Sequence, residues 1–491
     1  MKDQHSVMTI PGRIPYKWKA LLPVAMGTML VSMDAGILNI AFPVLTKALN
    51  TDLTTVIWVN LAYLLISTSL MPVLGKASDL FGRKRFFCTG LTIINIGLIT
   101  CAMVQGVGQL IFFRIIQAFG AALCLSCGNA IIREAFPVEE TGKGLGTISL
   151  FSSFGLIAAP VCGGLMLHWI SWRSIFYLRV PISLAALIMA IFLLKENKQK
   201  KESIIIDYKG IFTSGGGVFC FVLGISQMRH FGFKSVLVYG LICAGIGLLV
   251  LMIMYEKKAR EPIIDITLFR NPLFTCGITS LFLIFVAIPT YLLIMPFYLM
   301  QGIGMSPSNA GLLLGIPAAL SLILGPLSGF FSDRLGRSRF TTLGAIAFSL
   351  VYSLLFFQHN QSALFIIIII LLIQGIANGT FHPPNYSAIM ANVPSDRFGT
   401  AAALTATFRQ VGACIGIAMA GALFSAKRLA YENILKDQGI SFADARRAAI
   451  PLAFHDVLII SIIISACVVF ISIYTLKKEA SQSRPECLKD T

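Results

Sequence analysis

Charged side chains are scarce in this chain. Only 12% of its 491 residues are Asp, Glu, Lys or Arg, whereas 56% are hydrophobic, and the mean hydropathy is +0.81. Soluble globular domains carry roughly 25% charged residues. The composition therefore excludes an ordinary soluble protein. It predicts an all-α integral membrane protein, because long apolar runs indicate membrane-spanning helices.

The patterns of several other protein classes are missing as well. There is no zinc-finger spacing and no basic stripe interleaved with aromatic residues, so the net charge of +17 does not indicate nucleic-acid binding. The 11 cysteines are scattered and odd in number, which argues against a disulfide framework. We recognise no nucleophile–base set, metal cluster, phosphate loop or ATP-binding domain. We therefore expect no enzyme activity, no metal and no cofactor, and we expect an ion gradient to supply any energy for transport.

What the chain does contain is a series of apolar segments, each long enough to cross a bilayer. Fourteen such segments lie near 20–45, 53–75, 86–105, 107–131, 144–168, 174–195, 210–228, 235–255, 272–299, 309–331, 340–358, 361–390, 400–425 and 452–476. The first is too long for the apolar core of a signal peptide, and no convincing cleavage site follows it.

The distribution of Lys and Arg predicts how the chain is oriented. These residues are about three times as frequent on the side of the N-terminus as on the other side, which predicts a multi-pass protein of the plasma membrane with both termini in the cytoplasm. The main exception is the long loop 426–451, which has mixed charge and scattered apolar residues. It is either an amphipathic element lying on the outer surface or a solvated connector.

An internal repeat divides the chain in two. The motif Pro72-x-x-Gly75-x-x-Ser78-Asp79-x-x-Gly82-Arg83 recurs as Pro326-x-x-Gly329-x-x-Ser332-Asp333-x-x-Gly336-Arg337, each copy following the second span of its half. Weaker echoes pair Gln117 with Gln374 and Gly155 with Gly412. The repeat predicts two six-helix bundles, with the substrate site near the midplane between them. The expected units are 1–195, a linker with two extra transmembrane helices at 196–271, the second bundle at 272–476 and a cytoplasmic tail at 477–491.

Asp34 is the residue that most directly suggests function. It lies near the middle of the apolar run 21–45, where a charge costs roughly 2.5–3.5 kcal/mol on insertion scales. Arg114 is a cation inside another span and needs a partner. If the two approach, Arg114 favours the ionised form of Asp34 while burial favours the neutral form. Such a balance suits a group that takes up and releases a proton. The alternative is a static ion pair kept for packing.

These motifs resemble those of the major facilitator superfamily, and within it the fourteen-span branch of drug/proton antiporters of the multidrug and quaternary-ammonium efflux type. The loop from Gly75 to Arg85 is similar to the signature loop of that superfamily. Other similar stretches are Asp34-x-x-x-x-Asn39-x-Ala41-x-Pro43, Leu110-x-x-x-Arg114-x-x-Gln117-Ala118-x-Gly120 and Gly155-x-x-x-Ala159-Pro160-x-x-Gly163-Gly164. Ala118 and Ala159 stand where the family usually has glycine.

The resemblance implies roles for particular residues. Asp34 would be the proton acceptor and Arg114 the cation that tunes it. The two repeated loops would act as conformational switches through Gly75, Asp79, Gly82, Arg83, Gly329, Asp333, Gly336 and Arg337. The pattern of Gly155, Pro160, Gly163 and Gly164 accompanies export in the family. From the residues alone, we expect Asp79 to pair with Arg83 or to face a helix N-terminus of the other half.

The candidate substrate cavity is taken from polar and aromatic residues inside the spans. Its members are Asn39, Gln117, Arg179, Tyr298, His382, Arg409 and Gln410, with Tyr63, Tyr291, Asn378 and Asn385 as further candidates. Arg179 takes a place where relatives usually carry Asn. It either lines the cavity, which would favour an anionic or zwitterionic substrate, or extends to the outer surface. His382 precedes Pro383-Pro384, a sequence that predicts a broken helix.

Together these features predict a monomeric proton-coupled antiporter that exports amphipathic drugs or related small molecules by alternating access. Its partners would be the substrate, protons and the lipid bilayer, with no nucleic acid. The alternative is a dedicated transporter of one specific metabolite, and an anionic metabolite is one such substrate. A membrane sensor that transports nothing is a second alternative, from another class.

Overall fold

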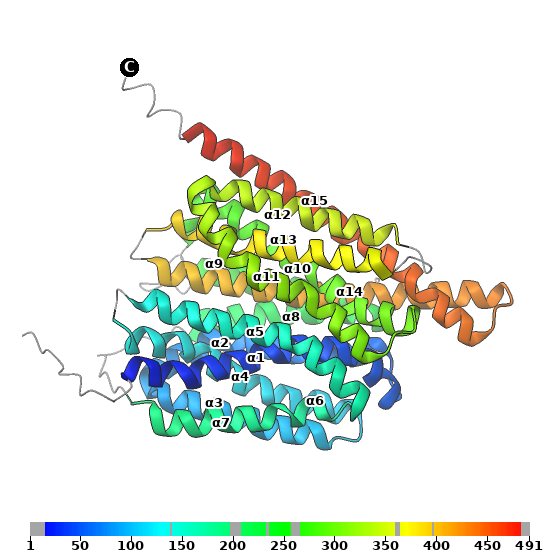
Figure 1. The fold of residues 1–491 in the computed structure, drawn as a ribbon, viewed down its shortest axis with the longest axis horizontal. Coiled ribbons are helices and arrows are strands. Elements are labelled where there is room, and N and C mark those ends of the chain that lie inside the picture. The colour runs from blue at the N-terminus through cyan, green and yellow to red at the C-terminus, as the bar shows by residue number, and fades with distance from the viewer. Residues whose placement is uncertain are drawn as a thin grey trace, which may run out of the picture.

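The computed structural model describes residues 15–137, 140–196, 208–231, 235–256, 266–358, 364–394 and 397–482. Over these residues all regular secondary structure is helical, and the long helices run roughly side by side (Figure 1). The expected all-α fold is confirmed. Helix formation satisfies every backbone N–H and C=O inside one segment, which a membrane span requires.

The first six-span unit contains seven helices, because one span is interrupted. They are α1 (Tyr16–Ala48), α2 (Leu53–Phe81), α3 (Arg83–Met103), α4 (Val107–Ala135), α5 (Thr141–Trp169), α6 (Ser174–Tyr177) and α7 (Arg179–Leu193). The sixth apolar segment is therefore split at Leu178 into a four-residue piece and a longer helix. Pro181 follows closely and removes one backbone donor from the first turn of α7.

The second unit repeats the arrangement. It contains α10 (Pro272–Phe297), α11 (Pro307–Leu335), α12 (Arg337–Phe356), α13 (Leu364–Ala391), α14 (Phe398–Asp437) and α15 (Phe442–Gln482). A 3-10 helix, η2 (Ile266–Arg270), precedes α10, and a π-helical turn, η3 (Tyr298–Gly302), continues it.

Between the units lie α8 (Tyr208–Phe231) and α9 (Val236–Glu256), which pack against each other. Twelve helices in the described part of the chain are long and apolar enough to cross a membrane. The apolar stretches described in α8 and α9, Gly215–Ile225 and Val236–Met252, are shorter than a span. The count of fourteen spans thus stays a prediction, as do the proposed boundaries at 195, 271 and 476.

The internal repeat has a matching geometry in the two halves. Gly82 ends α2 and Gly336 ends α11, and their backbone angles are nearly the same, with φ +104° and ψ 122° against φ +104° and ψ 124°. Each glycine N–H donates to a serine carbonyl four residues earlier, on Ser78 or Ser332, at 3.0 Å. A positive φ of this size is open to glycine without strain, which explains why the turn needs it.

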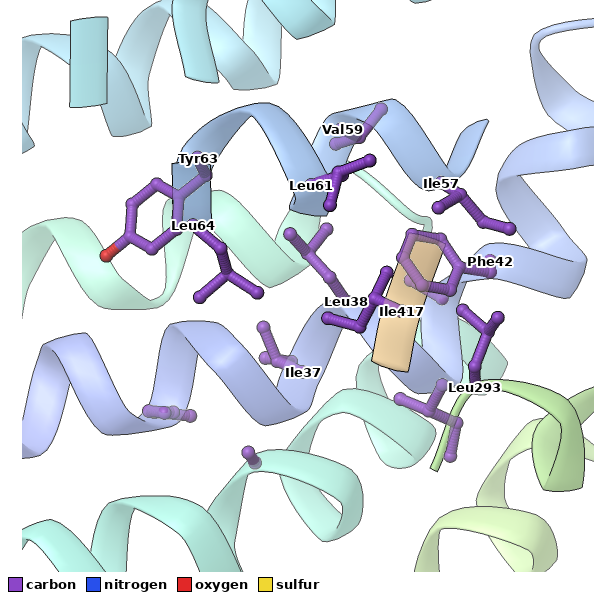
Figure 2. Packing of buried hydrophobic residues seen from close by; sticks show 14 of the residues in the cluster. Ile37, Leu38, Phe42, Ile57, Val59, Leu61, Tyr63, Leu64, Leu293 and Ile417 are labelled. Carbon is purple, nitrogen blue, oxygen red and sulfur yellow. The ribbon is translucent and has the colours of Figure 1, made fainter. Parts of the chain in front are cut away.

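The two halves pack against each other at the face opposite the chain termini. A Cβ placed on Gly164, near the end of α5, would lie 2.5 Å from the Pro307 carbonyl oxygen and 2.9 Å from Gly311 Cα, both on α11. Gln301 Nε2 donates to the Pro43 carbonyl at 3.3 Å. Figure 2 shows the apolar part of this contact, where residues of α1 and α2, including Phe42, pack beside Leu293 of α10 and Ile417 of α14.

Two expectations about local structure were wrong. The helix α13 continues through Pro383 and Pro384 and is not broken there. Pro383 lacks the N–H that would bond to the Gly379 carbonyl, and Ser328 Oγ of α11 donates to that carbonyl instead, at 2.6 Å. A hydroxyl from the neighbouring helix thus replaces the lost backbone bond.

The loop 426–451 is the second case. It does not lie along the surface, whereas its many exposed residues agree with the alternative of a solvated connector. The helices α14 and α15 continue through it and form a hairpin that projects beyond the other helices (orange in Figure 1). Gly439, with φ +83°, makes the turn at its tip. Near its base Lys427 Nζ lies 2.9 Å from Asp456 Oδ2, which joins the two arms.

Candidate functional site

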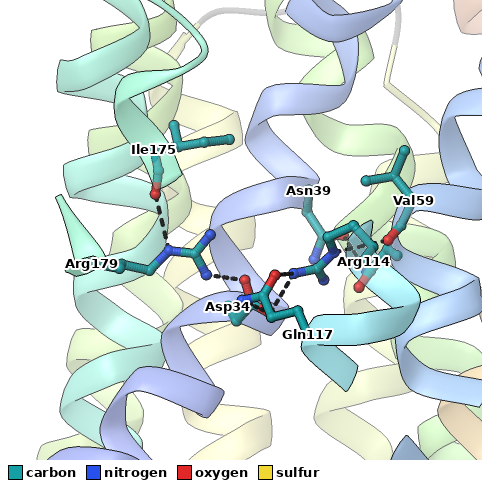
Figure 3. Close-up of polar contacts among 8 residues, drawn as sticks. Asp34, Asn39, Val59, Arg114, Gln117, Ile175 and Arg179 are labelled. Carbon is teal, nitrogen blue, oxygen red and sulfur yellow. Dashed lines mark hydrogen bonds and ion pairs between the residues drawn. The ribbon is translucent and has the colours of Figure 1, made fainter. Parts of the chain in front are cut away.

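The carboxylate of Asp34 lies inside the first bundle. Asp34 is 1% exposed and belongs to α1, about five turns from its start. Arg114 of α4 and Arg179 of α7 approach it from two sides (Figure 3). All three side chains are buried, so their charges are removed from solvent and lipid alike.

Arg114 binds the first carboxylate oxygen. Its Nη1 lies 2.6 Å from Asp34 Oδ2 and also donates to Gln117 Oε1 at 2.8 Å. Its Nε donates to the Val59 carbonyl of α2 at 3.1 Å, and the guanidinium lies over the Tyr63 ring at 4.0 Å. The predicted pairing of Asp34 with Arg114 is therefore present, with contacts from three further residues that fix the arginine in place.

Arg179 binds the second carboxylate oxygen. Its Nη1 donates to Asp34 Oδ1, and its Nε donates to the Ile175 carbonyl at 2.9 Å. Arg179 is 1% exposed, so it points inward and does not extend to the surface. The break at Leu178 lies directly before it, which places the arginine in the first turn of α7.

The cluster has one carboxylate and two guanidinium groups, and its net charge is +1 when all three are ionised. The Nη2 atoms of Arg114 and Arg179 are buried and have no hydrogen-bond partner within the described residues. A small pocket beside the cluster has Asp34, Tyr63, Gln117 and Arg179 among its lining residues, although almost all of its accessible wall is apolar. It has room for about one water molecule. The site therefore keeps unused donors next to a small space.

The second half lacks these charges. Gln374 of α13 corresponds to Gln117, and the residue three positions before it is Leu371, where the first half has Arg114. Leu371 and Gln374 are both buried, and Gln374 Oε1 has no partner among the residues that the structure describes. Ionisable groups thus occupy only one of the two equivalent positions.

The other candidate cavity residues fall into separate groups. Asn39 Oδ1 accepts from Asn60 Nδ2 at 3.5 Å, close to the charge cluster (Figure 3). Tyr298 is buried and packs its ring against Phe454 of α15, with centroids 5.6 Å apart, so it belongs to the packing of the second bundle. Asn385 is also structural, since it donates to the Gly277 carbonyl at 3.1 Å.

Arg409 and His382 form a second polar group. Arg409 is exposed although it lies about three turns inside α14, and Tyr386 of α13 is 45% exposed. His382 stacks near Phe285, with ring centroids 5.2 Å apart, and lies within electrostatic reach of Arg409. Gln410, the residue after Arg409, is partly buried. An exposed arginine at this depth shows that the helices do not close over its side chain.

The repeated loops differ in one contact. Arg83 Nη1 lies 2.6 Å from Glu134 Oε1 and 3.3 Å from the Ala130 carbonyl, both on α4. Arg337 Nε instead binds Asp333 on the preceding helix at 3.0 Å. The side chain of Asp79 lies outside the described residues. Its expected pairing with Arg83 or with a helix N-terminus of the other half therefore stays a prediction. Glu134 was not anticipated, although an acid at the end of a span is a visible signal in the sequence.

The small residues of α5 serve two neighbours. A Cβ on Gly163 would lie 2.8 Å from Ile37 Cγ1 of α1, whereas Gly164 faces α11 of the other half. Gly155 lies against Met29 of α1. This helix can therefore contact both bundles closely only because its side chains are small.

The fold and the site define a class. Two bundles with repeated loops that pack against each other, with charges buried inside one of them, form a multi-pass membrane transporter and not an enzyme. The family model for the Major Facilitator Superfamily matches residues 24–417, so the chain belongs to that superfamily.

Curated relatives transport different compounds. The chain is 29% identical to "Riboflavin transporter RibZ" of Clostridioides difficile (strain 630) over 430 residues, covering 87% of this chain and 92% of that protein. It is 26% identical to "Tetracenomycin C resistance and export protein" of Streptomyces glaucescens, covering 84% and 76%. It is 28% identical to "Multidrug resistance protein 3" of Bacillus subtilis (strain 168), covering 82% and 78%. These relatives support the predicted resemblance to drug-efflux transporters.

Solved structures share the fold at low identity. A bacterial homologue of the human lysosomal transporter Spinster aligns with a TM-score of 0.67 and 15% identity, covering 95% of this chain and 99% of that one. The nucleoside transporter NupG aligns with a TM-score of 0.61 and 14% identity, covering 94% and 100%.

Proposed function

We propose that this protein is a proton-coupled antiporter that exports amphipathic small molecules by alternating access. The observation that carries the proposal is the position of Asp34, buried in the middle of a span and held by Arg114 and Arg179. An acid at membrane depth is a functional candidate because its burial costs free energy that packing alone does not require.

In this scheme Asp34 alternates between two protonation states. Two guanidinium groups stabilise the ionised form, so the arrangement seen here corresponds to the state after proton release. Movement of either arginine away from the carboxylate removes that stabilisation and lets burial favour the neutral form. Proton uptake is thereby linked to a rearrangement of α4 or α7 relative to α1.

The packing of the two halves supports an assignment of conformation. Close contacts of α5 with α11 lie at the face opposite the termini, while Arg409, about three turns from the start of α14, is exposed. With both termini in the cytoplasm, as the Lys and Arg distribution predicts, this is an inward-facing state of a plasma-membrane protein. An exporter in this state receives its substrate from the cytoplasm.

A second candidate is a dedicated transporter of one anionic metabolite. The observation that favours it is the excess of cations, since Arg179 points inward and Arg409 is exposed although it lies well inside α14. A positive potential in a low-dielectric cavity attracts anions. The named substrate of one relative, riboflavin, also shows that a single metabolite is within the range of similar proteins.

The test is substrate-induced proton movement by purified protein in weakly buffered detergent solution. A lipophilic cation such as tetraphenylphosphonium is added to wild type and to Asp34→Asn, and the pH change is recorded. The proposal expects acidification by the wild type and none by Asp34→Asn. Asp456→Asn, which removes an acid of the projecting hairpin, is the matched control and should behave as wild type.

Two results would contradict the proposal in different ways. Undiminished proton release by Asp34→Asn would remove Asp34 from the coupling step. Saturable transport of one anion, with no protection of cells against any dye or drug, would favour the second candidate.

A further inference from the structure

The cluster around Asp34 carries more positive charge than it neutralises. Two buried guanidinium groups share one carboxylate, and the described residues of the neighbouring helices offer no second acid. The other titratable groups that face the cluster are Tyr63 of α2 and Cys101 of α3, which are neutral in their ordinary protonation states. A net positive charge in an apolar interior is costly unless a counter-ion accompanies it.

Unused hydrogen-bond donors point to the same conclusion. Arg114 and Arg179 each keep a buried Nη2 group without a partner in the described part of the chain. Leaving such a group unsatisfied costs more when it belongs to a charged side chain. Buried polar groups in native proteins are satisfied by protein, water or ligand, so these atoms need a partner.

The space beside the cluster limits what that partner is. The pocket that Arg179, Gln117 and Asp34 line holds about one water molecule, and its other walls include Ile94 and Leu98. A monatomic anion is close to this size, whereas the carboxylate of an amphipathic compound brings a larger body with it. Most of the accessible wall is apolar, but Arg179 and Gln117 stand at its edge and carry N–H donors, which suit an anion and not a cation.

We propose that Arg179, at the edge of this pocket, binds a halide-sized anion, chloride in the cell, which neutralises the Asp34–Arg114–Arg179 cluster. Protonation of Asp34 raises the charge of the cluster from +1 to +2 and therefore strengthens anion binding. By linkage, the bound anion favours proton uptake to the same extent. Only this pH dependence rests on the proposed protonation of Asp34; the anion site itself rests on the arginines and the pocket.

The experiment uses bromide, which replaces chloride and can be located by anomalous scattering. Crystals of the full-length protein soaked in bromide should show a peak within hydrogen-bond distance of Arg179 Nη2. In solution, bromide affinity measured by calorimetry should fall about tenfold or more in Arg179→Gln, because one charge-assisted contact is lost. Arg179→Lys keeps the charge and should retain part of the affinity. Arg334→Gln, which removes an exposed arginine of α11, is the matched control and should bind as wild type.

Asp34→Asn gives the sharpest expectation. This variant should bind bromide more tightly than the wild type and without dependence on pH, because its cluster is permanently at +2. The wild type should bind more tightly as the pH falls. Proton release that persists in Asp34→Asn would contradict the proposed function and leave the anion site standing, so the two failures are distinguishable.

Three results would overturn the anion site. They are the absence of a bromide peak beside Arg179, an affinity that Arg179→Gln leaves unchanged, and weaker binding by Asp34→Asn. Displacement of bromide by benzoate would assign the site to a substrate carboxylate and would overturn the halide assignment.

Discussion

Arg83 forms an ion pair with Glu134 on a different helix, at 2.6 Å, while its counterpart Arg337 pairs at 3.0 Å with Asp333, four residues earlier along the chain. The two loops share the same glycine turn, and they differ in that Arg83 reaches an acid on a neighbouring helix. In the first half the arginine ties the start of α3 to the end of α4. In the second half Arg337 pairs with Asp333, the acid at the end of the preceding helix, and does not reach a third helix through this contact.

The first prediction follows from this asymmetry. Arg83→Gln should slow transport more than Arg337→Gln, because only Arg83 links two helices that must keep their relation as the bundle moves. Both ion pairs are partly exposed, so each change should cost less than about 1 kcal/mol of unfolding free energy. Transport rates and thermal unfolding of the two variants are compared directly. Equal loss of transport would mean that the contact with Glu134 has no special role.

The second prediction concerns the contact between the halves. Gly164→Ala places a methyl group 2.5 Å from the Pro307 carbonyl, and backbone cannot easily move away. The halves should therefore separate at this face, and a cysteine introduced at Val161, which faces Gly315, should react faster with a maleimide. Mass spectrometry of that peptide gives the rate.

Gly146→Ala is the control for Gly164→Ala. It lies in the same helix, and a Cβ there would meet nothing within 4 Å. Alanine also improves helix propensity by up to about 1 kcal/mol at either site, so the pair isolates the steric effect. An unchanged labelling rate in Gly164→Ala would show that the face does not open in this way.

The third prediction concerns the energetics of the charge cluster. Asp34→Asn leaves two buried arginines without a carboxylate and should lower the unfolding free energy by about 3–5 kcal/mol. Adding Arg179→Gln removes one of those cations, so the double variant should be more stable than Asp34→Asn alone. Thermal unfolding in chloride-free detergent solution measures both. A double variant that is less stable than Asp34→Asn would contradict the electrostatic account.

The fourth prediction concerns pH at the start of the chain. Lys17 of α1 donates to the Glu140 carboxylate, which lowers the pKa of Glu140 from its ordinary value of 4.5. Because the pKa is lower in the folded state, the contact stabilises the fold above pH 4.5 and is lost as the pH falls through the lowered pKa. The difference in thermal midpoint between wild type and Glu140→Gln should therefore be present at neutral pH and vanish in acid. A difference that persists in acid would contradict this assignment.

The fifth prediction concerns orientation. The hairpin of α14 and α15 lies at the opposite end of the molecule from the termini (Figure 1). A cysteine at Gln438 should react with a membrane-impermeant maleimide in intact cells, whereas one at Gln482 should react only after the membrane is permeabilised. The reverse result would place the termini outside.

Much of the site was predictable because its residues break the apolar pattern. Asp34 and Arg114 stand alone in their spans, and each needs a partner of opposite charge, so their pairing follows from the cost of burial. The repeated glycines were equally informative, since a turn that requires positive φ at Gly82 requires it again at Gly336. Signals of this kind depend on local chemistry, so they can be read from the sequence without knowledge of how the helices pack.

The direction of Arg179 was not predictable. It lies near the start of its span, from which a long side chain can reach either the surface or the interior. The helix break at Leu178 decides the matter, and nothing in the apolar pattern marks that break. The same limit applies to Pro383, since the hydroxyl that satisfies the freed carbonyl comes from Ser328 on another helix, and only tertiary structure brings it there.

The projecting hairpin breaks the near-symmetry of the molecule, because it lies at one end and belongs to one half. A protein built from two similar bundles gives nearly the same image after a half-turn, which hampers particle alignment in electron microscopy. Among the described residues only the second half carries such extended arms, those of α14 and α15, so they mark one lobe and one side of the detergent belt. An antibody fragment raised against the tip around Gly439 would add mass at that place without touching the transport path.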